Sequence, residues 1–251
     1  MFKFVLRAVR MACVAVLCIV AFTSTTYAKI DTTDILGRKI TLEKPGEQVM
    51  LGFYFEDYIA ITGPTAIDRL KAISLNYWKG YRPLQYEAYL KIAPEIADLM
   101  DVGDADAGTM SAEKIIASQP DVVILSAGQY KYLGASAQTI EQVGIPLVVV
   151  DYNAQTVDKH VASTLIIGQV MGAEDRAAKL AEQYKAGVDD TLLRVAKASA
   201  EKKKVYVELG QKGASEFGNT YGKGMWAGVV DAAGGLNIAE GQIANWGPLN
   251  P

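Results

Sequence analysis

After the first 28 residues, the hydrophobic and polar positions alternate between short apolar runs and stretches with a helical period. The apolar runs are rich in β-branched residues and predict strands at 49–52, 70–74, 121–126 and 147–150. Amphipathic or capped segments between them predict helices at 56–62, 111–118 and 131–143. Strands that alternate with helices in this way indicate an α/β lobe around a parallel sheet. The strand at 121–126 is almost continuously apolar, which is typical of a strand covered on both faces.

A second helical pattern is much longer. Residues 174–198 place apolar side chains at helical spacing, and Gly187 is the only glycine or proline among them. At 1.5 Å per residue this helix would be about 37 Å long. That is more than one small lobe needs, so we expect the helix to bridge two lobes. A shorter helix over 162–171 precedes it.

A new strand at 205–209 and a helix near 226–233 indicate the beginning of a second α/β lobe. One strand and one helix cannot form a sheet with its own core. The segment 247–251 also resembles the turn that leads into the helix 111–118 of the first lobe, without the helix and strand that follow there. We therefore expect an incomplete second lobe in this chain.

The N-terminal segment has the pattern of a secretory signal. Three basic residues precede an apolar run over 11–22, and small residues lead up to Ala28. The run is shorter than the roughly 20 residues that a membrane span needs. We expect cleavage after Ala28 and export to the periplasm, and both cysteines, Cys13 and Cys18, would be removed with the leader. The predicted organisation is a leader over 1–28, a first lobe over 29–155, a helical connection over 156–200 and a second lobe over 201–251.

Charge and motifs exclude several function classes. Without the three basic residues of the leader, 22 Lys and Arg stand against 28 Asp and Glu, a net charge of −6. Such an acidic chain is a poor partner for nucleic acid or anionic membrane. The sequence has no Gly-x-Ser-x-Gly elbow and no phosphate-binding glycine loop. These features favour a binding protein over an enzyme, with no cofactor.

A metal site held by protein side chains is also not indicated. His160 is the only histidine, and its position beside Lys159 on a helix predicts a solvent-facing side chain. The acidic run 101–108 lacks the spacing of a calcium loop, so an ordinary acidic turn is expected there. Iron would then arrive already chelated, or be bound through tyrosine oxygens.

Several segments, taken in order, resemble the iron-siderophore and cobalamin class of periplasmic binding proteins. They are the hairpin 34–42 followed by Pro45, the segments Asp-Val-Gly at 101–103, 111–116 and 119–124, and the pair 233–238 and Trp-Gly-Pro at 246–248. The resemblance implies two α/β lobes joined by a rigid helix, with the ligand held in the cleft between them. It also implies a monomer that delivers its ligand to an ABC permease of the inner membrane.

In that family the ligand contacts come from loops at strand ends, which agrees with the general behaviour of α/β sheets. Aromatic side chains gather at such positions in this sequence, and packing within a lobe is the alternative for each ring. Our candidates for the ligand site are Tyr54, Phe55, Trp78, Tyr81, Tyr130 and Tyr152 in the first lobe and Phe217 and Trp246 in the second. Arg82, together with Lys79, would pair with an anionic ligand.

The aromatic content favours a bulky, partly apolar ligand. We expect an iron-siderophore or related metal chelate first, cobalamin or haem next, and an oxyanion such as molybdate after these. Glu113 in the helix 111–118 resembles the acidic residue with which this family docks on the permease. The alternative for Glu113 is a first-turn acid that is favoured by the helix dipole alone.

Overall fold

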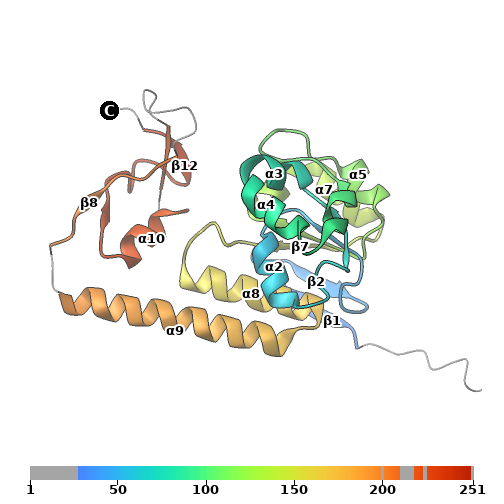
Figure 1. The fold of residues 1–251 in the computed structure, drawn as a ribbon, viewed down its shortest axis with the longest axis horizontal. Coiled ribbons are helices and arrows are strands. Elements are labelled where there is room, and N and C mark those ends of the chain that lie inside the picture. Colours follow the sequence, from blue (N-terminus) through green and yellow to red (C-terminus); the bar gives the residue numbers. More distant parts are fainter. Residues whose placement is uncertain (1–27, 199–200, 210–217, 223–224, 250–251) are drawn as a thin grey trace, which may run out of the picture.

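The computed structural model describes residues 28–198, 201–209, 218–222 and 225–249. Apart from Ala28, the predicted leader lies outside these residues. Figure 1 shows two lobes on one side of the long helix α9 (Glu174–Ala198), one above each end of the helix. The predicted two-lobe α/β architecture with a helical connection is confirmed.

The first lobe is built on a sheet of five parallel strands in the order β5-β4-β3-β6-β7. The strands are β3 (Val49–Leu51), β4 (Leu70–Ile73), β5 (Met100–Asp101), β6 (Val122–Ser126) and β7 (Leu147–Val150). All five residues of β6 are buried, as the continuous apolar run predicted.

Successive strand residues face two separate apolar cores. On β3, Val49 and Leu51 belong to one core and Met50 belongs to the other. The first core includes buried residues of α2 (Phe55–Thr62) and α8 (Val157–Met171). The second core is closed by α5 (Ala112–Ala117), α6 (Ala127–Leu133) and α7 (Ala135–Gln142). Both faces of the sheet are thus covered by helices.

The segment that follows β4 differs from the sequence prediction. Trp78 and Tyr81 were expected in a loop at a strand end, but α3 (Leu75–Tyr81) is a helix, and α4 (Pro83–Leu90) and the 3₁₀-helix η2 (Pro94–Asp98) follow it. Leu75 and Trp78 are three residues apart and both buried, so one helix face packs on the lobe. Pro83 suits the first turn of α4, which explains the break between the two helices.

The single helix predicted over 131–143 is also wrong, because the structure has α6 and α7 with a break at Gly134. Gly134 has φ 51° and ψ −122°, a conformation outside the helical range. Helix α6 begins at Ala127, before the predicted start at residue 131, because Ser126 caps it. The Ser126 hydroxyl accepts from Gln129 N at 3.2 Å, and Gln129 Oε1 accepts from Ser126 N at 3.1 Å. This is a capping box.

The hairpin predicted near the N-terminus is confirmed as β1 (Ile30–Thr33) paired antiparallel with β2 (Lys39–Leu42). Asp34, whose side chain is fully buried, organises the turn between them. Its carboxylate accepts from the backbone N–H groups of Leu36 and Arg38 and from the Arg38 guanidinium at 2.6 Å. The same carboxylate accepts from Val149 N at 3.2 Å, which fastens the hairpin to β7.

Helices α8 and α9 form the connection between the lobes. Helix α8 begins at Val157, five residues before the predicted start, and ends at Met171, just before Gly172, whose φ of 65° is left-handed. The predicted bounds of α9 are confirmed. A Cβ at Gly168 would lie 2.3 Å from the Cβ of Ala177, so the two helices cross closely at this point. Among the described helices, none combines the length and the apolar character that a membrane crossing requires.

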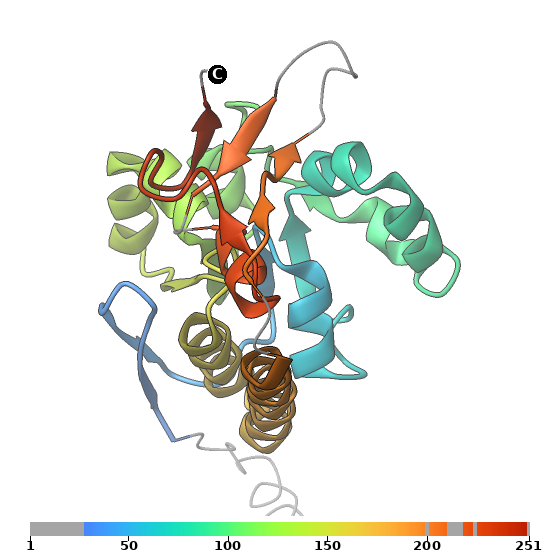
Figure 2. The same ribbon diagram turned by 90° about the vertical axis from the view of Figure 1, so that its left-hand side faces the viewer.

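The described part of the second lobe contains two small sheets. Strands β8 (Lys204–Val205) and β11 (Leu236–Asn237) are parallel, and β9 (Glu208–Leu209), β10 (Asn219–Tyr221) and β12 (Trp246–Pro248) are antiparallel in the order β12-β10-β9. Helix α10 (Ala227–Ala232) packs beside β11 and faces α9 (Figure 2).

Two sequence predictions for this lobe need correction. The strand predicted at 205–209 is divided between the two sheets, and the Thr220 hydroxyl donates to Val207 O at 2.6 Å where the chain passes from one to the other. Trp246, which was expected in a loop at a strand end, lies in strand β12, where it pairs with Tyr221. The two lobes are in contact where α10 approaches the loop before α8. The approach is close, since a Cβ added at Gly228 would lie only 2.2 Å from Gln155 O.

Candidate ligand-binding site

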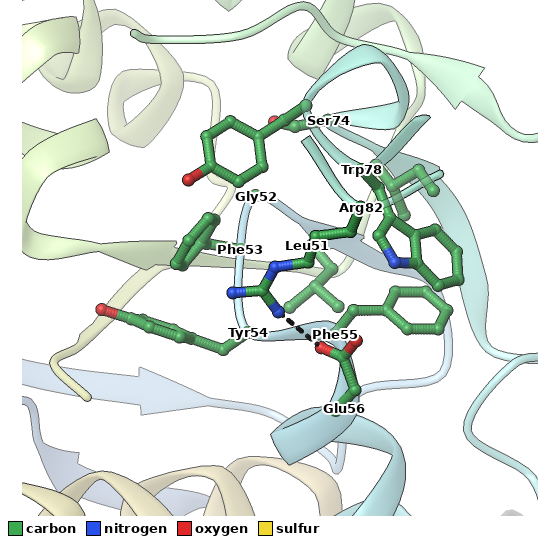
Figure 3. A pocket seen from close by; sticks show the side chains of 11 residues that line it. Leu51, Gly52, Phe53, Tyr54, Phe55, Glu56, Ser74, Trp78 and Arg82 are labelled. Atoms are coloured by element: carbon green, nitrogen blue, oxygen red, sulfur yellow. Dashed lines mark hydrogen bonds and ion pairs between the residues drawn. The ribbon is translucent and has the colours of Figure 1, made fainter. Parts of the chain in front are cut away.

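A hollow opens at the carboxyl ends of β3 and β4 in the first lobe (Figure 3). It holds about 340 Å³ of empty space, part of which is open solvent. The strand order reverses between β3 and β6, so the place where ligands of α/β proteins commonly bind adjoins this hollow on the other side of β3. The lining residues are Leu51, Gly52, Phe53, Tyr54, Phe55, Glu56, Ile73, Ser74, Tyr77, Trp78 and Arg82.

Aromatic rings from α2 and α3 build one wall of this pocket. The rings of Phe55 and Trp78 lie 3.7 Å apart between centroids, tilted by 33°. Tyr86 of α4 packs edge-on against Trp78 at 5.3 Å. Phe55 and Trp78 are 7% and 5% exposed, so these rings are part of the first core as well as of the pocket lining.

The backbone is strained where the pocket begins. Tyr54, the residue before α2, has φ 59° and ψ 48°. This left-handed conformation is uncommon for a residue other than glycine, and strain of this kind concentrates at functional sites. The turn allows neighbouring rings to reach different partners, because Phe53 packs on Tyr77 at 4.6 Å whereas Phe55 packs on Trp78.

A continuous row of rings passes through the pocket. Consecutive centroids lie 4.6 to 5.2 Å apart. The row connects α3 with the long helix α9 by way of the strand ends. In order, its members are Tyr81, Tyr77, Phe53, Tyr54, Tyr152, His160 and Tyr184.

His160 is not the solvent-facing residue that the sequence predicted. Its ring stacks on Tyr184 at 4.9 Å, and its Nε2 lies 2.9 Å from Tyr152 O. Burial lowers the pKa of His160, and the contact with Tyr152 O opposes this effect. His160 therefore supports the loop after β7 and does not line the pocket.

The pocket contains one ion pair. Arg82 Nη1 donates to Glu56 Oε2 at 3.2 Å, and the guanidinium lies 5.8 Å from the centroid of the Phe53 ring. Figure 3 shows the guanidinium between Phe53, Tyr54 and Glu56. Lys79, the other cation predicted to meet an anion, places its ammonium 5.6 Å from the Tyr86 ring. Burial, with a smaller contribution from the charge of Glu56, raises the pKa of Asp57 to about 6.

Several residues that line the pocket have buried polar atoms without partners. Within the described part of the chain, Tyr54 Oη, Trp78 Nε1, Ser74 Oγ and Glu56 Oε1 have no hydrogen-bond partner in the protein. All four residues line the pocket. A buried polar atom that lacks a partner typically costs about 1–3 kcal/mol. A ligand that pairs with these atoms would recover part of that free energy.

Some of the predicted site residues line the pocket and others do not. Tyr54, Phe55, Trp78 and Arg82 line the pocket. Tyr152 is buried behind Tyr54, at 5.0 Å between ring centroids.

The remaining candidates lie farther away. Tyr81 is 54% exposed on α3 and reaches the pocket through Tyr77. Tyr130 does not line the pocket. Its ring packs against Arg38, whose Cζ lies 4.2 Å from the ring centroid. Trp246 is half exposed on β12, and Phe217 lies outside the described residues.

Sequence reasoning missed the polar members of the lining. Ser74 comes directly after β4, and Glu56 stands in the first turn of α2. Their positions at the ends of predicted strands would have been the signal for including them. Their lack of partners, by contrast, becomes visible only in the packed structure.

Glu113 stands apart from the pocket, in the first turn of α5. Ser111 caps this helix by accepting from Lys114 N at 3.2 Å, as predicted, and its hydroxyl donates to Glu113 Oε2 at 2.7 Å. This hydrogen bond lowers the pKa of Glu113. The carboxylate is exposed and therefore accessible to a partner.

The chain is similar to periplasmic binding proteins in sequence and in structure. Residues 78–251 match the family model described as periplasmic binding protein. A structure of a TroA-like periplasmic binding protein, FepB from Veillonella parvula, is similar at 29% identity and a TM-score of 0.77. The match covers 88% of this chain and 65% of that one, so this chain spans about two thirds of its length.

Two further solved structures share the fold at lower identity. The molybdate-binding protein MolA from Haemophilus influenzae is 18% identical, with a TM-score of 0.66 over 88% of this chain and 69% of that one. The heme binding protein HmuT is 18% identical, with a TM-score of 0.59 over 89% of this chain and 67% of that one. A search of curated proteins gave no match.

Proposed function

Because this chain belongs to the periplasmic binding protein family, we propose that it is the solute-binding component of an ABC importer and captures an iron-siderophore or related metal chelate. The observation that carries this proposal is the aromatic pocket at the strand ends of the first lobe, whose lining residues include four with a buried polar atom that lacks a partner in the protein. The ligand would lie between the two lobes. Membership of this family supports a binding role for the chain.

The lining favours a bulky chelate over the other ligand classes. Broad ring surfaces complement a large, partly apolar ligand. An oxyanion, the ligand of the similar MolA structure, would need several free donors, and Arg82 is already paired with Glu56. Haem or cobalamin is the second candidate, because the row of rings also suits a flat macrocycle.

The proposed cellular setting has two parts. The N-terminal leader would direct the protein to the periplasm, where a monomer carries the ligand to the permease. Glu113 would dock on that permease, because it is exposed and its hydrogen bond from Ser111 keeps it ionised. Glu113→Gln should leave ligand affinity unchanged and reduce the stimulation of ATP hydrolysis by the reconstituted importer. Undiminished stimulation would refute the docking role.

Tryptophan and tyrosine fluorescence tests the ligand proposal. The purified protein is titrated in parallel with ferric siderophores, haem, cobalamin and molybdate. We expect saturable quenching by a ferric chelate. Phe53→Leu, which keeps an apolar side chain but removes a lining ring, should weaken binding by about 3–10-fold, since one aromatic contact contributes about 0.5–1.5 kcal/mol.

A matched control variant is Tyr132→Leu, because Tyr132 is a ring on α6 that is 43% exposed and does not line the pocket. It should bind like the unchanged protein. Quenching by molybdate alone, or equal affinities of the two variants for the chelate, would contradict the proposal.

A further inference from the structure

Gln129 of α6 is a buried polar residue that connects two strand ends. Its side chain is only 5% exposed. The carboxamide Nε2 donates to Gly52 O at 2.8 Å, and Oε1 accepts from Ser126 N at 3.1 Å. Gly52 directly follows β3, and Ser126 is the last residue of β6. One carboxamide therefore joins the carboxyl ends of these two strands through both of its polar atoms.

This side chain lies where the strand order reverses. β3 and β6 are neighbours in the sheet, and the chain continues from them in opposite directions, to β4 and to β7. The space outside such a reversal is commonly open to ligands in α/β proteins. Among the described residues, the pocket lining comes from β3, β4 and the segments after them, with no member from β6 or α6. Gln129 therefore takes up the space at the reversal, and the pocket opens on the β4 side of β3.

The backbone of Gly52 is fixed to β6 and α6. Its N–H donates to Ile124 O at 2.9 Å, and its carbonyl accepts from Gln129. A Cβ at Gly52 would lie 2.3 Å from Gln129 Oε1 and 2.9 Å from Leu125 Cδ2. Only glycine allows these side chains to approach the backbone so closely, and both polar groups of this residue have their partners on the same side.

Two rings of the pocket lining directly follow Gly52. They belong to Phe53 and Tyr54. Tyr54 has the strained left-handed backbone, and its side chain makes no capping hydrogen bond at the start of α2. A strained conformation persists only where the surrounding structure holds it. Gln129 holds the peptide group between Gly52 and Phe53 through its carbonyl, one residue before the strained position.

We propose that Gln129 is a positioning residue for ligand binding: it closes the strand reversal with its own carboxamide and keeps the rings of Phe53 and Tyr54 in the pocket wall. The inference rests on the proposed function, and in it the ligand meets the rings and not Gln129. The ligand enters on the β4 side and leaves the contact with Gly52 intact. The donor to Gly52 O is the half of the carboxamide that positions the wall, whereas the acceptor for Ser126 N belongs to the helix cap.

Gln129→Glu removes this donor and keeps both the size of the side chain and the acceptor for Ser126 N. An ionised carboxylate would face Gly52 O without a proton, whereas a protonated carboxyl donates to it again. At pH 7.5 we expect the variant to bind a ferric trihydroxamate at least about 5-fold more weakly than the unchanged protein, because a buried acceptor has lost its donor. At pH 5, where burial favours the protonated form, the difference should fall below about 2-fold. Both proteins are measured at each pH, because Asp57 titrates near pH 6 in both.

Backbone NMR examines the same contact without a ligand. The amide resonances of Phe53 and Tyr54 in Gln129→Glu should differ from those of the unchanged protein at pH 7.5 and approach them at pH 5. Ser126→Ala is the matched control, because it removes the hydroxyl that accepts from Gln129 N and leaves the carboxamide contact with Gly52. This control should lower the melting temperature, as the loss of a helix cap does, and leave the Phe53 resonance and the affinity unchanged.

A measurement on the unchanged protein covers the case in which Gln129→Glu does not fold. The Nε2 protons of Gln129 should exchange with solvent at least about 10-fold more slowly than those of the exposed Gln142 on α7, and saturation with the ferric trihydroxamate should not accelerate them. Fast exchange, or exchange that the chelate accelerates, would overturn the inference.

The outcomes separate this inference from the proposed function. Equal affinities of Gln129→Glu and the unchanged protein at pH 7.5, an unmoved Phe53 resonance, or the same response in Ser126→Ala would each contradict the positioning role. If the Phe53 resonance moves and returns with pH as expected, but no ferric chelate binds to either protein, the proposed function fails and the positioning of the wall stands.

Discussion

Asp57 allows a quantitative test of the electrostatics at the pocket. It stands in the first turn of α2, where the helix dipole favours a negative charge. Burial and the neighbouring charge of Glu56 nevertheless raise the pKa of Asp57 from 3.8 to about 6, against a smaller opposing effect of Arg82. The folded protein therefore holds a carboxylate in a place that disfavours its ionised form. We predict that Asp57→Asn stabilises the protein at neutral pH.

The magnitude follows from the two pKa values. Each pH unit between them corresponds to about 1.4 kcal/mol, so the full difference is about 3 kcal/mol. The side chain is only partly buried, and screening by solvent reduces this to about 1–2 kcal/mol. The sign follows from linkage. Because the folded-state pKa is the higher one, the favourable contribution of protonated Asp57 is complete below about pH 4 and is lost as the pH rises through about 6.

Urea unfolding at pH 4, 5, 6 and 7.5 is the assay. The free energy of unfolding of Asp57→Asn should exceed that of the unchanged protein by about 1–2 kcal/mol at pH 7.5, and the difference should vanish near pH 4. Asp158→Asn is the matched control, because Asp158 is an exposed acid in the first turn of α8, and this variant should show no gain. An Asp57→Asn protein that is no more stable at pH 7.5, or equally stabilised at pH 4, would refute the reasoning.

Three further outcomes are expected. Asp34→Ala should lower the free energy of unfolding by about 3–5 kcal/mol in urea, because it leaves the guanidinium of Arg38 and the donors around it without their buried acceptor; a loss below 1 kcal/mol would contradict this. Gly228→Ala should push α10 away from the loop before α8, and small-angle scattering should show a larger radius of gyration. An unchanged radius and unchanged ligand affinity would argue against this contact. Trp78→Ala should cost about 3–5 kcal/mol in thermal unfolding, whereas the exposed Tyr81→Ala should cost less than about 1 kcal/mol. Similar costs for both would mean that α3 does not pack as described.

The sequence predicted those parts of the fold that depend on local pattern. The strands β6 and β7 are continuous apolar runs because helices cover both faces of the sheet, and such runs are visible without a structure. The long helix α9 was predicted to the residue, since Gly172 ends the preceding helix and α9 itself contains only Gly187 as an interruption.

The sequence pattern was misleading where tertiary contacts determine the secondary structure of a segment. The segment of α3 has no helical period, because its seven residues bury only Leu75 and Trp78. Its helical conformation depends on packing against the lobe and on Pro83, which begins the next helix. For the site, the sequence identified the rings that follow the strand ends. It could not identify the unpartnered atoms of Ser74 and Glu56, because these depend on how the ends of β3 and β4 pack together.

Some rings of the pocket also belong to the core of the lobe, whereas the charged residues beside them do not. Stability and ligand specificity therefore depend on different residues. Phe55 and Trp78 are members of the first core and also line the pocket, so replacing either ring changes stability together with binding. Glu56 and Arg82 line the pocket and are partly exposed, and Asp57 follows Glu56 on α2; these residues contribute charge without filling the core. The ionised form of Asp57 even opposes folding. A change of ligand class is therefore expected to arise through these three positions, with the aromatic wall kept, and exchanging their charges should alter which chelate binds while the lobe remains folded.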